Sequence, residues 1–474
     1  MLGRVFKAYD IRGTYPDLLN DMMAWQIGFG TSKFLLGDAE AAGETTPMMK
    51  NIVVGRDMRK SSPSLSTELI RGINDQGGNV IDVGLVDTPM VYFAINHLDC
   101  AGGVMVTASH NPPQYNGFKV SKRKAKPVGE PTGLADIRKH AAMIDKITYA
   151  KLAPTITRGR VEQRDLWDAY IAHVRSFLHL SGRKLRVVVD ASNAMAGTMV
   201  PRVFGKKGSG VAGLEIIEIN FDNTRGEFVH EPNPLVPENV RQTREAVVKE
   251  KADLGFCFDG DADRCMVVDE KANIVGCDHL TALMARHFLK AAPGASVLYD
   301  LRSSKAVSEE ITKAGGVPVR GRVGHVFMKQ ELSDRRGVFG GELSGHFYFR
   351  DNFNADSGAI AMAVALTIRS EAGKPMSELI APIARYAQSG EINFETEEKD
   401  KALAAVKEQL GVRGTVDELD GVTVDRFKAD GWWCNVRKSN TEPLLRLNAE
   451  AKDKKTLASC LDKVAPLLGK RVAH

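Results

Sequence analysis

Three aspartates stand at alternate positions in the segment FDGDADR, residues 258–264: Asp259, Asp261 and Asp263. Gly260 allows a tight turn, and apolar residues on both sides indicate that the segment adjoins a buried strand. Carboxylates this close repel one another unless a cation neutralises them. Hard oxygen ligands favour Mg²⁺, which keeps a coordination position open for water or a phosphate oxygen. The segment therefore predicts a magnesium site, with Arg264 beside it as a cation for phosphate.

The segment RKSNTEPLLR, residues 437–446, has side chains that suit a phosphate group: a guanidinium, two hydroxyls and an amide, from Arg437, Ser439, Thr441 and Asn440. Several donors converging on three oxygens are typical of phosphate sites, and the N–H groups of a turn add to them. A Ser-Asn-Thr turn before a proline also occurs without any ligand. The segment by itself leaves both interpretations open.

The segment GGELSGH, residues 340–346, places Glu342 and Ser344 two positions apart, so that they would face the same side of an extended chain. A carboxylate beside a hydroxyl suits neighbouring hydroxyl groups of a sugar, and the flanking glycines let the backbone approach a ligand. His346 in this segment and His325 in GRVGHVFMK are ambiguous, because a single histidine is more often structural than functional.

The segment MVTASHNPPQYNGFK, residues 105–119, ends an apolar, β-branched run and then continues through two prolines. Prolines interrupt the hydrogen-bond ladder of a strand, so we expect irregular structure after residue 108. Ser109 is therefore either part of a stiff surface turn or a side chain presented for chemistry, and the segment alone does not decide.

Further polar residues near expected strands or turns are weak candidates one by one: Tyr9, Arg12, Arg56 and Arg59. The basic cluster KRKAK, residues 122–126, predicts a solvated loop. It is too short and lacks the aromatic partners that nucleic-acid binding would need.

Short apolar runs alternate with longer segments of helical period, which predicts βαβ units and mixed, mostly parallel sheets. We expect strands at residues 51–55, 102–108, 185–190, 214–220, 253–259 and 296–300. We expect helices at residues 62–76, 162–179, 237–251, 278–291, 303–314 and 356–371. Beyond residue 372 the pattern predicts strands at 391–395, 421–427, 432–438 and 444–451, and helices at 398–410 and 454–467.

A weak internal repeat supports this organisation, because IVVGRDMR, RVVVDASN and SVLYDLRS each indicate a strand that leads through a polar loop into a helix. A later strand in each repeat ends in one of the unusual segments above. The sequence thus predicts three similar mixed-sheet α/β domains, each with one special loop at a strand's carboxyl end, and a smaller α+β domain. The predicted domains span residues 1–153, 154–256, 257–372 and 373–474.

The composition is that of a globular protein: 474 residues, with 64 Lys and Arg against 59 Asp and Glu. This small positive excess mildly favours anionic ligands and is unlike the charge of a nucleic-acid binder. The six cysteines lack CxxC spacing, so neither a disulfide framework nor a zinc site is predicted. No apolar stretch reaches the length of a membrane span. We expect a cytoplasmic protein that does not bind membranes.

The segments TASHNPPQYNGFK, DGDADR, GGELSGH and RKSNTEPLLR, in this order, resemble the four active-site loops of the α-D-phosphohexomutases. The resemblance covers essentially the whole chain, and DGDADR and GELSGH are most similar to the phosphomannomutase and phosphomannomutase/phosphoglucomutase branch. It implies four domains around a central active-site cleft. It also implies an isomerase that moves phosphate between positions 1 and 6 of a hexose phosphate.

The resemblance assigns roles to individual residues. Ser109 matches the serine that becomes phosphorylated, and its phosphate oxygen would complete the shell of a Mg²⁺ ion held by Asp259, Asp261 and Asp263. Glu342 and Ser344 match the pair that binds the sugar hydroxyls. The site for the phosphate that is not transferred is matched by Arg437, Ser439, Asn440 and Thr441. Further active-site positions are matched by Tyr9, Arg12, His110, Lys119, Arg264, His325 and His346.

In the implied mechanism, phosphoserine donates its phosphate, a hexose 1,6-bisphosphate forms and reorients, and the serine takes back the other phosphate. Hexose 1,6-bisphosphate would also be the activator. Lys119 and His325 are candidates for moving the hydroxyl proton. Arg302 departs from the pattern, because some bifunctional relatives have a lysine near the substrate. Arginine keeps the charge but cannot act as a base, so we expect Arg302 to bind phosphate or stabilise charge.

The expected reaction converts mannose 6-phosphate to mannose 1-phosphate, with glucose phosphates also accepted. Phosphoglucosamine mutases typically have DGDGDR and GEQSGH, from which Ala262 and Leu343 depart, but that activity remains an alternative. A metal-dependent sugar phosphatase and a non-catalytic sugar-phosphate binding protein are less favoured alternatives. The expected partners are small hexose phosphates, with no nucleic acid, and the chain is expected to be a monomer or a homodimer.

Overall fold

The computed structural model describes residues 2–205, 210–439 and 444–472 and divides the chain into two compact units. The first unit comprises Met1–Val275 with Ser344–Ser377, and the second comprises Gly276–Leu343 with Glu378–His474. Among the helices of the described ranges, none has the length and apolar character that crossing a membrane requires.

The first unit begins with a mixed sheet in the strand order β1-β5-β4-β2-β3-β7, with β6 paired to β5. Strands β2, β3, β4 and β7 run parallel, whereas β5 is antiparallel to β4 and β1. The strands are β1 (Ile11–Thr14), β2 (Asn51–Arg56), β3 (Asn79–Leu85), β4 (Gly102–Val106), β5 (Tyr115–Lys122), β6 (Lys126–Pro127) and β7 (Val161–Gln163).

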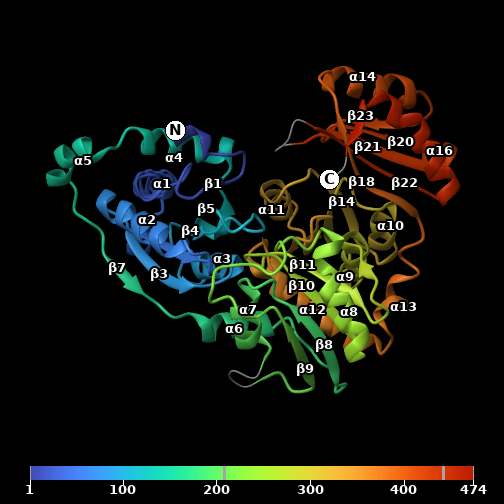
Figure 1. The fold of residues 1–474 in the computed structure, drawn as a ribbon, viewed down its shortest axis with the longest axis horizontal. Coiled ribbons are helices and arrows are strands. Elements are labelled where there is room, and N and C mark those ends of the chain that lie inside the picture. Colours follow the sequence, from blue (N-terminus) through green and yellow to red (C-terminus); the bar gives the residue numbers. More distant parts are fainter. Residues whose placement is uncertain (1, 206–209, 440–443, 473–474) are drawn as a thin grey trace. The chain divides into compact units, whose positions relative to one another are not determined.

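Helices cover both faces of this sheet, which explains why its central strands are apolar at nearly every position. Ile52 and Val54 of β2 share a core with α1 and α2, whereas Gly55 lies against Val91 of α3. Figure 1 shows α1, α2 and α4 together beside the blue strands. The helices of this part are α1 (Asp21–Ala41), α2 (Ser62–Gln76), α3 (Thr88–His97), α4 (Leu134–Ala142) and α5 (Lys146–Leu152).

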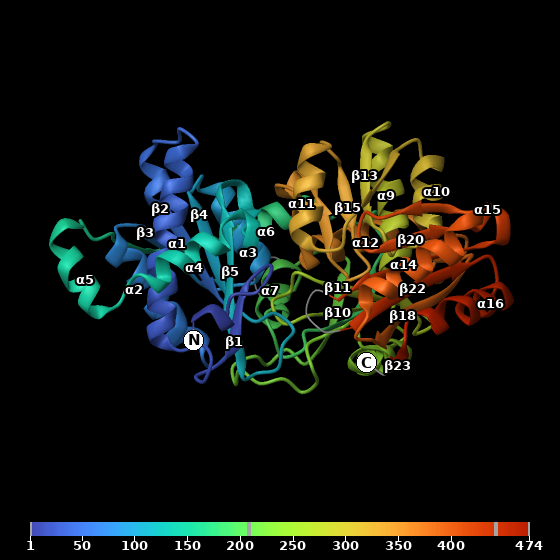
Figure 2. The same cartoon turned by 90° about the horizontal axis from the view of Figure 1, so that it is seen from above.

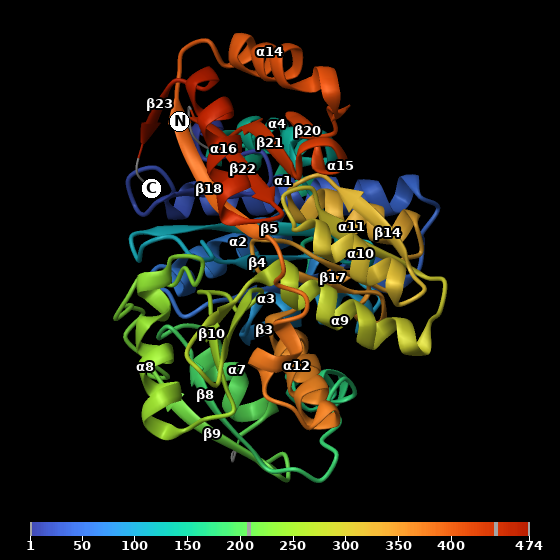
Figure 3. The same ribbon diagram turned by 90° about the vertical axis from the view of Figure 1, so that its right-hand side faces the viewer.

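A second mixed sheet of the first unit has the strand order β12-β11-β10-β8-β9. Strands β8, β9 and β10 are parallel, and β10 continues through a tight loop into the antiparallel β11. Figure 3 shows α8 beside β8 and β10. The strands are β8 (Leu185–Asp190), β9 (Leu214–Ile219), β10 (Leu254–Phe258), β11 (Cys265–Asp269) and β12 (Ile274–Val275). The helices are α6 (Trp167–Arg175), α7 (Ala196–Val203) and α8 (Arg241–Glu250).

The segment 344–377 completes the first unit with a short antiparallel hairpin and a buried helix. The hairpin consists of β16 (Phe347–Phe349) and β17 (Ala355–Asp356), and the helix is α12 (Gly358–Ala372). Ser357 caps α12, because its hydroxyl accepts a hydrogen bond from the N–H of Ile360 at 3.2 Å. The adjoining helix α13 spans Met376–Ile380.

The second unit starts with parallel strands in the order β14-β13-β15. They are β13 (Ser296–Asp300), β14 (Val317–Gly321) and β15 (Phe339–Gly341). The helices of this part are α9 (Cys277–Ala291), α10 (Lys305–Lys313) and α11 (His325–Asp334).

The rest of the second unit is an antiparallel sheet in the order β19-β20-β21-β22-β18-β23. Helices α14 and α16 share one apolar core with this sheet (Figure 2). The strands are β18 (Ala387–Glu395), β19 (Thr415–Asp417), β20 (Val422–Asp425), β21 (Trp432–Lys438), β22 (Leu444–Ala451) and β23 (Lys470–Val472). The helices are α14 (Lys399–Leu410), α15 (Phe427–Asp430) and α16 (Lys454–Val464).

The expected fold class is confirmed, since mixed α/β sheets come first and an antiparallel sheet with helices comes last. The helix expected at 162–179 is shorter, because residues 161–163 pair with β3 as β7. The irregular structure expected after residue 108 ends at Gln114, since Tyr115–Lys122 forms β5. The boundary expected at 256/257 falls within β10, and the sheet continues to residue 275. The long helix α1 was not among the expected elements.

Candidate active site

Ser109 lies just beyond β4 in a left-handed backbone conformation, with φ 51°. The strand places it there, and its N–H donates to Thr107 Oγ1 at 2.9 Å, which fixes the turn. Only 4% of the residue is exposed. Its hydroxyl donates to Asp259 Oδ2 at 3.1 Å and lies 3.3 Å from His110 Nδ1. A strained, oriented serine beside an aspartate is the arrangement of a functional side chain.

The three aspartates predicted as metal ligands lie in the loop between β10 and β11, and all are buried: Asp259, Asp261 and Asp263. The left-handed residue of this tight turn is Ala262, whose φ is 58°. Gly260, which the sequence indicated as the turn residue, has a different role. A Cβ on Gly260 would lie 2.1 Å from the carbonyl oxygen of Ser109. Glycine is therefore required at position 260, because the aspartate loop lies directly against the backbone of Ser109.

The aspartate loop has the chemistry of a divalent-cation site. One carboxylate oxygen from each aspartate lies within 4.8 Å of the others. Asp261 Oδ1 is buried and has no hydrogen-bond partner among the described residues. A buried carboxylate oxygen without a partner is unfavourable unless a cation reaches it, and oxygen ligands suit Mg²⁺. The residues therefore fit the ion that the sequence predicts.

Lys119 neutralises part of this negative charge. Phe118 and Val120 on β5 face the core, so the alternation of the strand places Lys119 on the opposite face. Its Nζ lies 2.6 Å from Asp261 Oδ2 and 2.6 Å from Asp263 Oδ2. Burial opposes the charge of Lys119, but the two aspartates outweigh it and raise its pKa well above the usual value. Lys119 is therefore a protonated, fixed cation in this arrangement.

Arg264 and His110 complete the surroundings of the serine. Arg264 Nε donates to Asp259 Oδ2 at 2.8 Å, and Arg264 Nη2 has no hydrogen-bond partner among the described residues. Burial raises the pKa of Asp259 to about 7, although Arg264 acts in the other direction. Burial, together with Arg264 and Arg12, lowers the pKa of His110 well below its usual value, so this imidazole is neutral.

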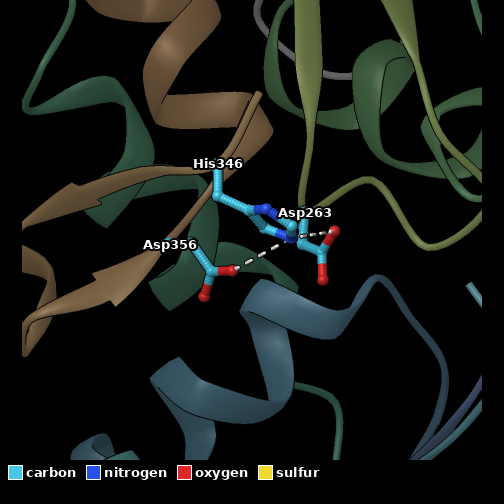
Figure 4. A group of neighbouring side chains, drawn as sticks. All are labelled: Asp263, His346 and Asp356. Carbon is cyan, nitrogen blue, oxygen red and sulfur yellow. Dashed lines mark ion pairs between the residues drawn. The ribbon is translucent and has the colours of Figure 1, made fainter. Parts of the chain in front are cut away.

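His346, which was ambiguous in the sequence, lies at this site (Figure 4). Its Nε2 is 3.5 Å from Asp263 Oδ1 and 3.8 Å from Asp356 Oδ2, and its Nδ1 is 2.9 Å from Ser344 Oγ. Burial would raise the pKa of Asp263, but Lys119 and His346 outweigh burial and hold that pKa well below its usual value. His346 therefore connects the aspartate loop to the hairpin β16–β17.

Arg12 and Tyr9 lie at the start of the same unit. Arg12 on β1 is aligned with Gly117 of β5, and its guanidinium donates to Asn111 Oδ1 and to Asp10. Arg12 thus reaches the segment that follows Ser109. Tyr9 is half-buried in the bend before β1.

The remaining predicted residues lie in the second unit or beyond the described ranges. Glu342 is buried and accepts a hydrogen bond from the N–H of Gly324 at 2.8 Å, at the start of α11. His325 is the half-buried first residue of α11. Ser439 follows β21, and its N–H donates to Leu444 O at 2.9 Å. Asn440 and Thr441 lie outside the described residues.

The prediction that Glu342 and Ser344 face the same side of an extended chain is wrong. Strand β15 ends at Gly341, residues 343–344 form a turn, and Gly345 has φ 86°. The alternation of a strand does not apply across such a turn.

Arg302 and Arg437 belong to a cluster of arginines around Glu391 in the second unit. Arg437 on β21 and Arg446 on β22 stand directly opposite one another, which is unfavourable for like charges. Glu391 resolves this conflict: its Oε2 accepts from Arg437 Nη2 at 2.8 Å and its Oε1 from Arg446 Nη1 at 2.9 Å. Arg302 Nη1 lies 3.7 Å from Glu391 Oε2, and the Nε and Nη2 of Arg302 donate to the carboxylate of Asp300.

Sequence reasoning did not single out Asp356, Thr88 or Glu391. The hydroxyl of Thr88 donates to Asp261 Oδ2 at 2.5 Å, and its N–H donates to Asp261 O at 3.0 Å. A threonine that starts a helix gives no sign of this contact. Glu391 follows a β-bulge in which Gly390 has φ 67°, and a bulge re-aims side chains. A charged residue directly after a glycine in an expected strand was the available signal.

Comparison with known proteins assigns most of the chain to one family. Four models of phosphoglucomutase/phosphomannomutase domains match in order: alpha/beta/alpha domain I at residues 3–148, domain II at 168–273, domain III at 277–386 and the C-terminal domain at 391–467. The chain is 37% identical to a phosphomannomutase of Escherichia coli over 451 residues, which is 94% of either protein.

Two further proteins are similar to the chain over nearly its whole length. The chain is 38% identical over 451 residues to a protein of Xanthomonas campestris named phosphohexose mutases, covering 94% of this chain and 95% of that protein. A crystal structure of a phosphoglucomutase/phosphomannomutase family protein from Burkholderia thailandensis superposes with a TM-score of 0.85 at 29% identity, over 98% of this chain and 96% of that one.

Proposed function

Because the chain belongs to the phosphoglucomutase/phosphomannomutase family, whose members act on hexose phosphates, we propose that it interconverts mannose 6-phosphate and mannose 1-phosphate. Glucose phosphates are accepted as well. The observation that carries the proposal is Ser109, held in a left-handed turn with its hydroxyl 3.1 Å from an aspartate of a buried carboxylate loop.

Ser109 carries the phosphoryl group in the active enzyme. It donates the group to a hydroxyl of the bound hexose phosphate, which yields a hexose 1,6-bisphosphate, and it takes back the other phosphate after this intermediate has reoriented. Added hexose 1,6-bisphosphate acts as the activator because it phosphorylates Ser109. A serine in a fixed turn suits this cycle, in which the substrate moves and the nucleophile does not.

Cationic side chains around Ser109 support the transfer. Asp259, Asp261 and Asp263 would hold Mg²⁺, which neutralises charge on the phosphate that moves. Lys119 and Arg264 provide fixed positive charge beside these carboxylates, and Arg264 Nη2 is available to a phosphate oxygen. Lys119 and His325 remain the residues proposed for moving the hydroxyl proton, and Lys119, which is protonated, would act as the donor.

Substrate binding is proposed for residues of both units. Glu342 and Ser344 would bind the sugar hydroxyls, and Arg302 would bind phosphate or stabilise its charge. The phosphate that is not transferred would be bound by Arg437, Ser439, Asn440 and Thr441. Tyr9, Arg12, His110 and His346 complete the proposed site. The four domains remain a proposal as well, with the second boundary moved from 256/257 to the end of β12. A cytoplasmic location and a monomer or homodimer remain predictions.

Coupled assays with separate substrates test the function. The purified protein is supplied with Mg²⁺ and a hexose 1,6-bisphosphate, and mannose, glucose and glucosamine 6-phosphates are offered in turn, while free inorganic phosphate is measured in parallel. We expect 1-phosphate products from mannose and glucose substrates without stoichiometric release of phosphate. Turnover of glucosamine phosphate alone, or release of one phosphate per substrate, would refute the proposal.

A further inference from the structure

The segment that follows Ser109 has many carbonyl groups and few N–H donors to pair with them. Pro112 and Pro113 contribute no N–H, and the segment lies between β4 and β5 without a strand partner of its own. Carbonyl groups near a buried site need donors from elsewhere in the chain. The N–H of Tyr15 binds the carbonyl oxygen of Gln114 at 2.9 Å. Four further carbonyl groups are bound by one side chain, which comes from the segment between β2 and α2.

Arg59 uses the four N–H groups of its Nη1 and Nη2 in this role, and 1% of the residue is exposed. Its Nη2 donates at 2.8 Å and 2.7 Å to the carbonyl oxygens of Ser109 and Asn111. Its Nη1 donates at 2.8 Å and 3.0 Å to those of Pro112 and Tyr115. Its Nε donates to Asp57 Oδ2 at 3.1 Å. A guanidinium has five N–H donors in a fixed planar arrangement, so these bonds define the shape of the loop.

Arg59 is itself held rigidly. Asp57 Oδ1 accepts from the N–H of Arg59 at 3.0 Å and from the hydroxyl of Ser62 at 2.5 Å. Asn116 Nδ2, at the start of β5, donates to the hydroxyl of Ser62 at 2.9 Å. The guanidinium also lies over the ring of Phe228, 5.1 Å from its centre. The side chain therefore has one well-defined position.

The carbonyl group of Ser109 connects the hydrogen bonds of Arg59 to the loop that carries Asp259, Asp261 and Asp263. Arg59 Nη2 binds that oxygen, and the Cα of Gly260 lies so close to it that an added Cβ would be only 2.1 Å away. The backbone of the serine is thus fixed between Arg59 and the loop that presents the three aspartates. A shift of the carbonyl would move the serine hydroxyl away from Asp259.

We propose that Arg59 is a positioning residue for phosphoryl transfer: by binding four carbonyl groups of the segment Ser109–Tyr115, it fixes the Ser109 hydroxyl against the aspartate loop. The inference rests on the proposed function of Ser109. It assigns the motif GRDMR to the transfer step, whereas in the sequence Arg59 was only a weak candidate. Arg59 does not touch the serine hydroxyl, so its effect belongs to the geometry of the reacting group.

Replacement of Arg59 by lysine tests this role. Arg59→Lys keeps the charge, but one ammonium has three donors on a single atom and cannot reach four carbonyl groups and Asp57 together. We expect kcat to fall by about 10²-fold, as small misplacements of reacting groups do. KM for the hexose phosphate should change by less than roughly threefold, because the substrate contacts remain. The rate at which hexose 1,6-bisphosphate phosphorylates Ser109 in a single turnover should fall in parallel with kcat.

A matched control separates positioning from general stability. Arg369 is another mostly buried arginine of the first unit, and its Nη2 donates to Asp253 Oδ1 at 2.8 Å, away from the serine. Arg369→Lys should lower the thermal midpoint without changing kcat. An Arg59→Lys protein that is folded and retains kcat within twofold of wild type would overturn the proposal.

A second variant covers a failure of Arg59→Lys to fold. Asp57→Asn removes the charge that aligns Arg59 and keeps the shape of the side chain. We expect kcat to fall by about tenfold with KM unchanged, as for an interaction made only in the transition state. An unchanged kcat in Asp57→Asn would overturn the proposal. An inactive wild-type enzyme would instead refute the proposed function, so the two failures are distinguishable.

Discussion

The carboxylate loop of the first unit and the arginine cluster of the second unit are opposite in charge and alike in construction. In the loop, three aspartates are partly neutralised by two cations, Lys119 and Arg264. In the cluster, three arginines are partly neutralised by two carboxylates, Asp300 and Glu391. Each region therefore keeps an excess of one sign in a partly buried place.

The difference in sign determines which kind of ion each region attracts. The carboxylate loop has a buried acceptor without a hydrogen-bond partner among the described residues, Asp261 Oδ1, so it attracts a cation. The cluster has an unsatisfied donor within the described ranges, Arg437 Nε, so it attracts an anion. In the proposed function, a cation beside the serine would serve transfer, and the arginines would serve binding.

The largest effect is expected from a loss of charge in the carboxylate loop. Asp261→Asn weakens the metal site and leaves Lys119 with one carboxylate, so turnover should fall by at least about 10²-fold. Turnover measured against Mg²⁺ concentration checks this, and chelation of the metal should abolish the activity of the wild type. Asp253 lies just before β10, the strand that leads into the loop, and forms an ion pair with Arg369. Asp253→Asn is the control, and its turnover should stay near that of the wild type. Equal activity of the two variants would contradict a metal role for the loop.

The contact between the loop and the serine predicts the next effect. Gly260→Ala forces a Cβ to within 2.1 Å of the Ser109 carbonyl oxygen, and backbone must move to make room. We expect a loss of about 1–3 kcal/mol in stability, as for overpacked cores, together with a clear fall in turnover. Gly37→Ala is the matched control, since a Cβ there meets nothing within 4 Å. The account is contradicted if both variants behave alike in thermal melts and in turnover.

A pH effect on stability is expected from Asp87, a buried residue whose carboxyl group interacts with Asp261 and Asp263. Burial, and to a lesser extent Asp261 and Asp263, raises the pKa of Asp87 to about 7. Its pKa in the unfolded chain is about 3.9, so folding takes up a proton between about pH 4 and 7. The stability that protonation contributes is complete below about pH 4 and is lost as the pH rises through about 7.

Asp87→Asn removes this titration. Between pH 5 and pH 8 in chelator-containing buffer, the free energy of unfolding should fall more in the wild type than in the variant, by on the order of 2 kcal/mol, and the thermal midpoints should fall accordingly. Asp17→Asn, at an exposed position of the same unit, should behave like the wild type. Parallel pH dependences for wild type and Asp87→Asn would contradict this, because Asp87 would then not titrate between pH 5 and pH 8.

The smallest effect concerns the arginine cluster. Glu391→Gln removes the negative charge that Arg437 and Arg446 share while keeping an acceptor oxygen, so the cluster becomes more positive. Hexose phosphates and inorganic phosphate should bind roughly fivefold tighter, or about 1 kcal/mol, as KM and phosphate inhibition at fixed ionic strength would report. Glu395→Gln, exposed on the same strand, should change neither quantity. Weaker binding in Glu391→Gln would mean that Glu391 orients the arginines and does not compete with phosphate.

Periodicity and local charge in the sequence predicted much of the fold and part of the site. Strands β2, β8 and β13 and helix α2 lie where apolar runs and helical period placed them, and DGDADR predicted a cation site whose geometry the structure supports. Contacts between distant segments were not predictable. Arg59 reaches the segment Ser109–Tyr115 across 50 to 56 residues, and Asp356 joins Asp263 through His346. Such contacts depend on sheet order, which no local pattern specifies.

Turn geometry was also beyond local patterns. A glycine before an aspartate suggested the turn at Gly260, but the left-handed residue is Ala262 and the glycine serves a close approach to Ser109. The turn at residues 343–344 likewise ended the strand in which Glu342 and Ser344 would have alternated. At Gly260 the backbone is determined by the neighbouring segment that contains Ser109.

The central claim is that Ser109 carries the phosphoryl group, and phosphopeptide mass spectrometry tests it most directly. The purified protein is incubated with hexose 1,6-bisphosphate, digested and analysed, and a second sample is treated with excess mannose 6-phosphate before digestion. We expect phosphate on Ser109 in the first sample and its loss in the second. Phosphate on a different residue, or a Ser109→Ala protein with full turnover, would contradict the account.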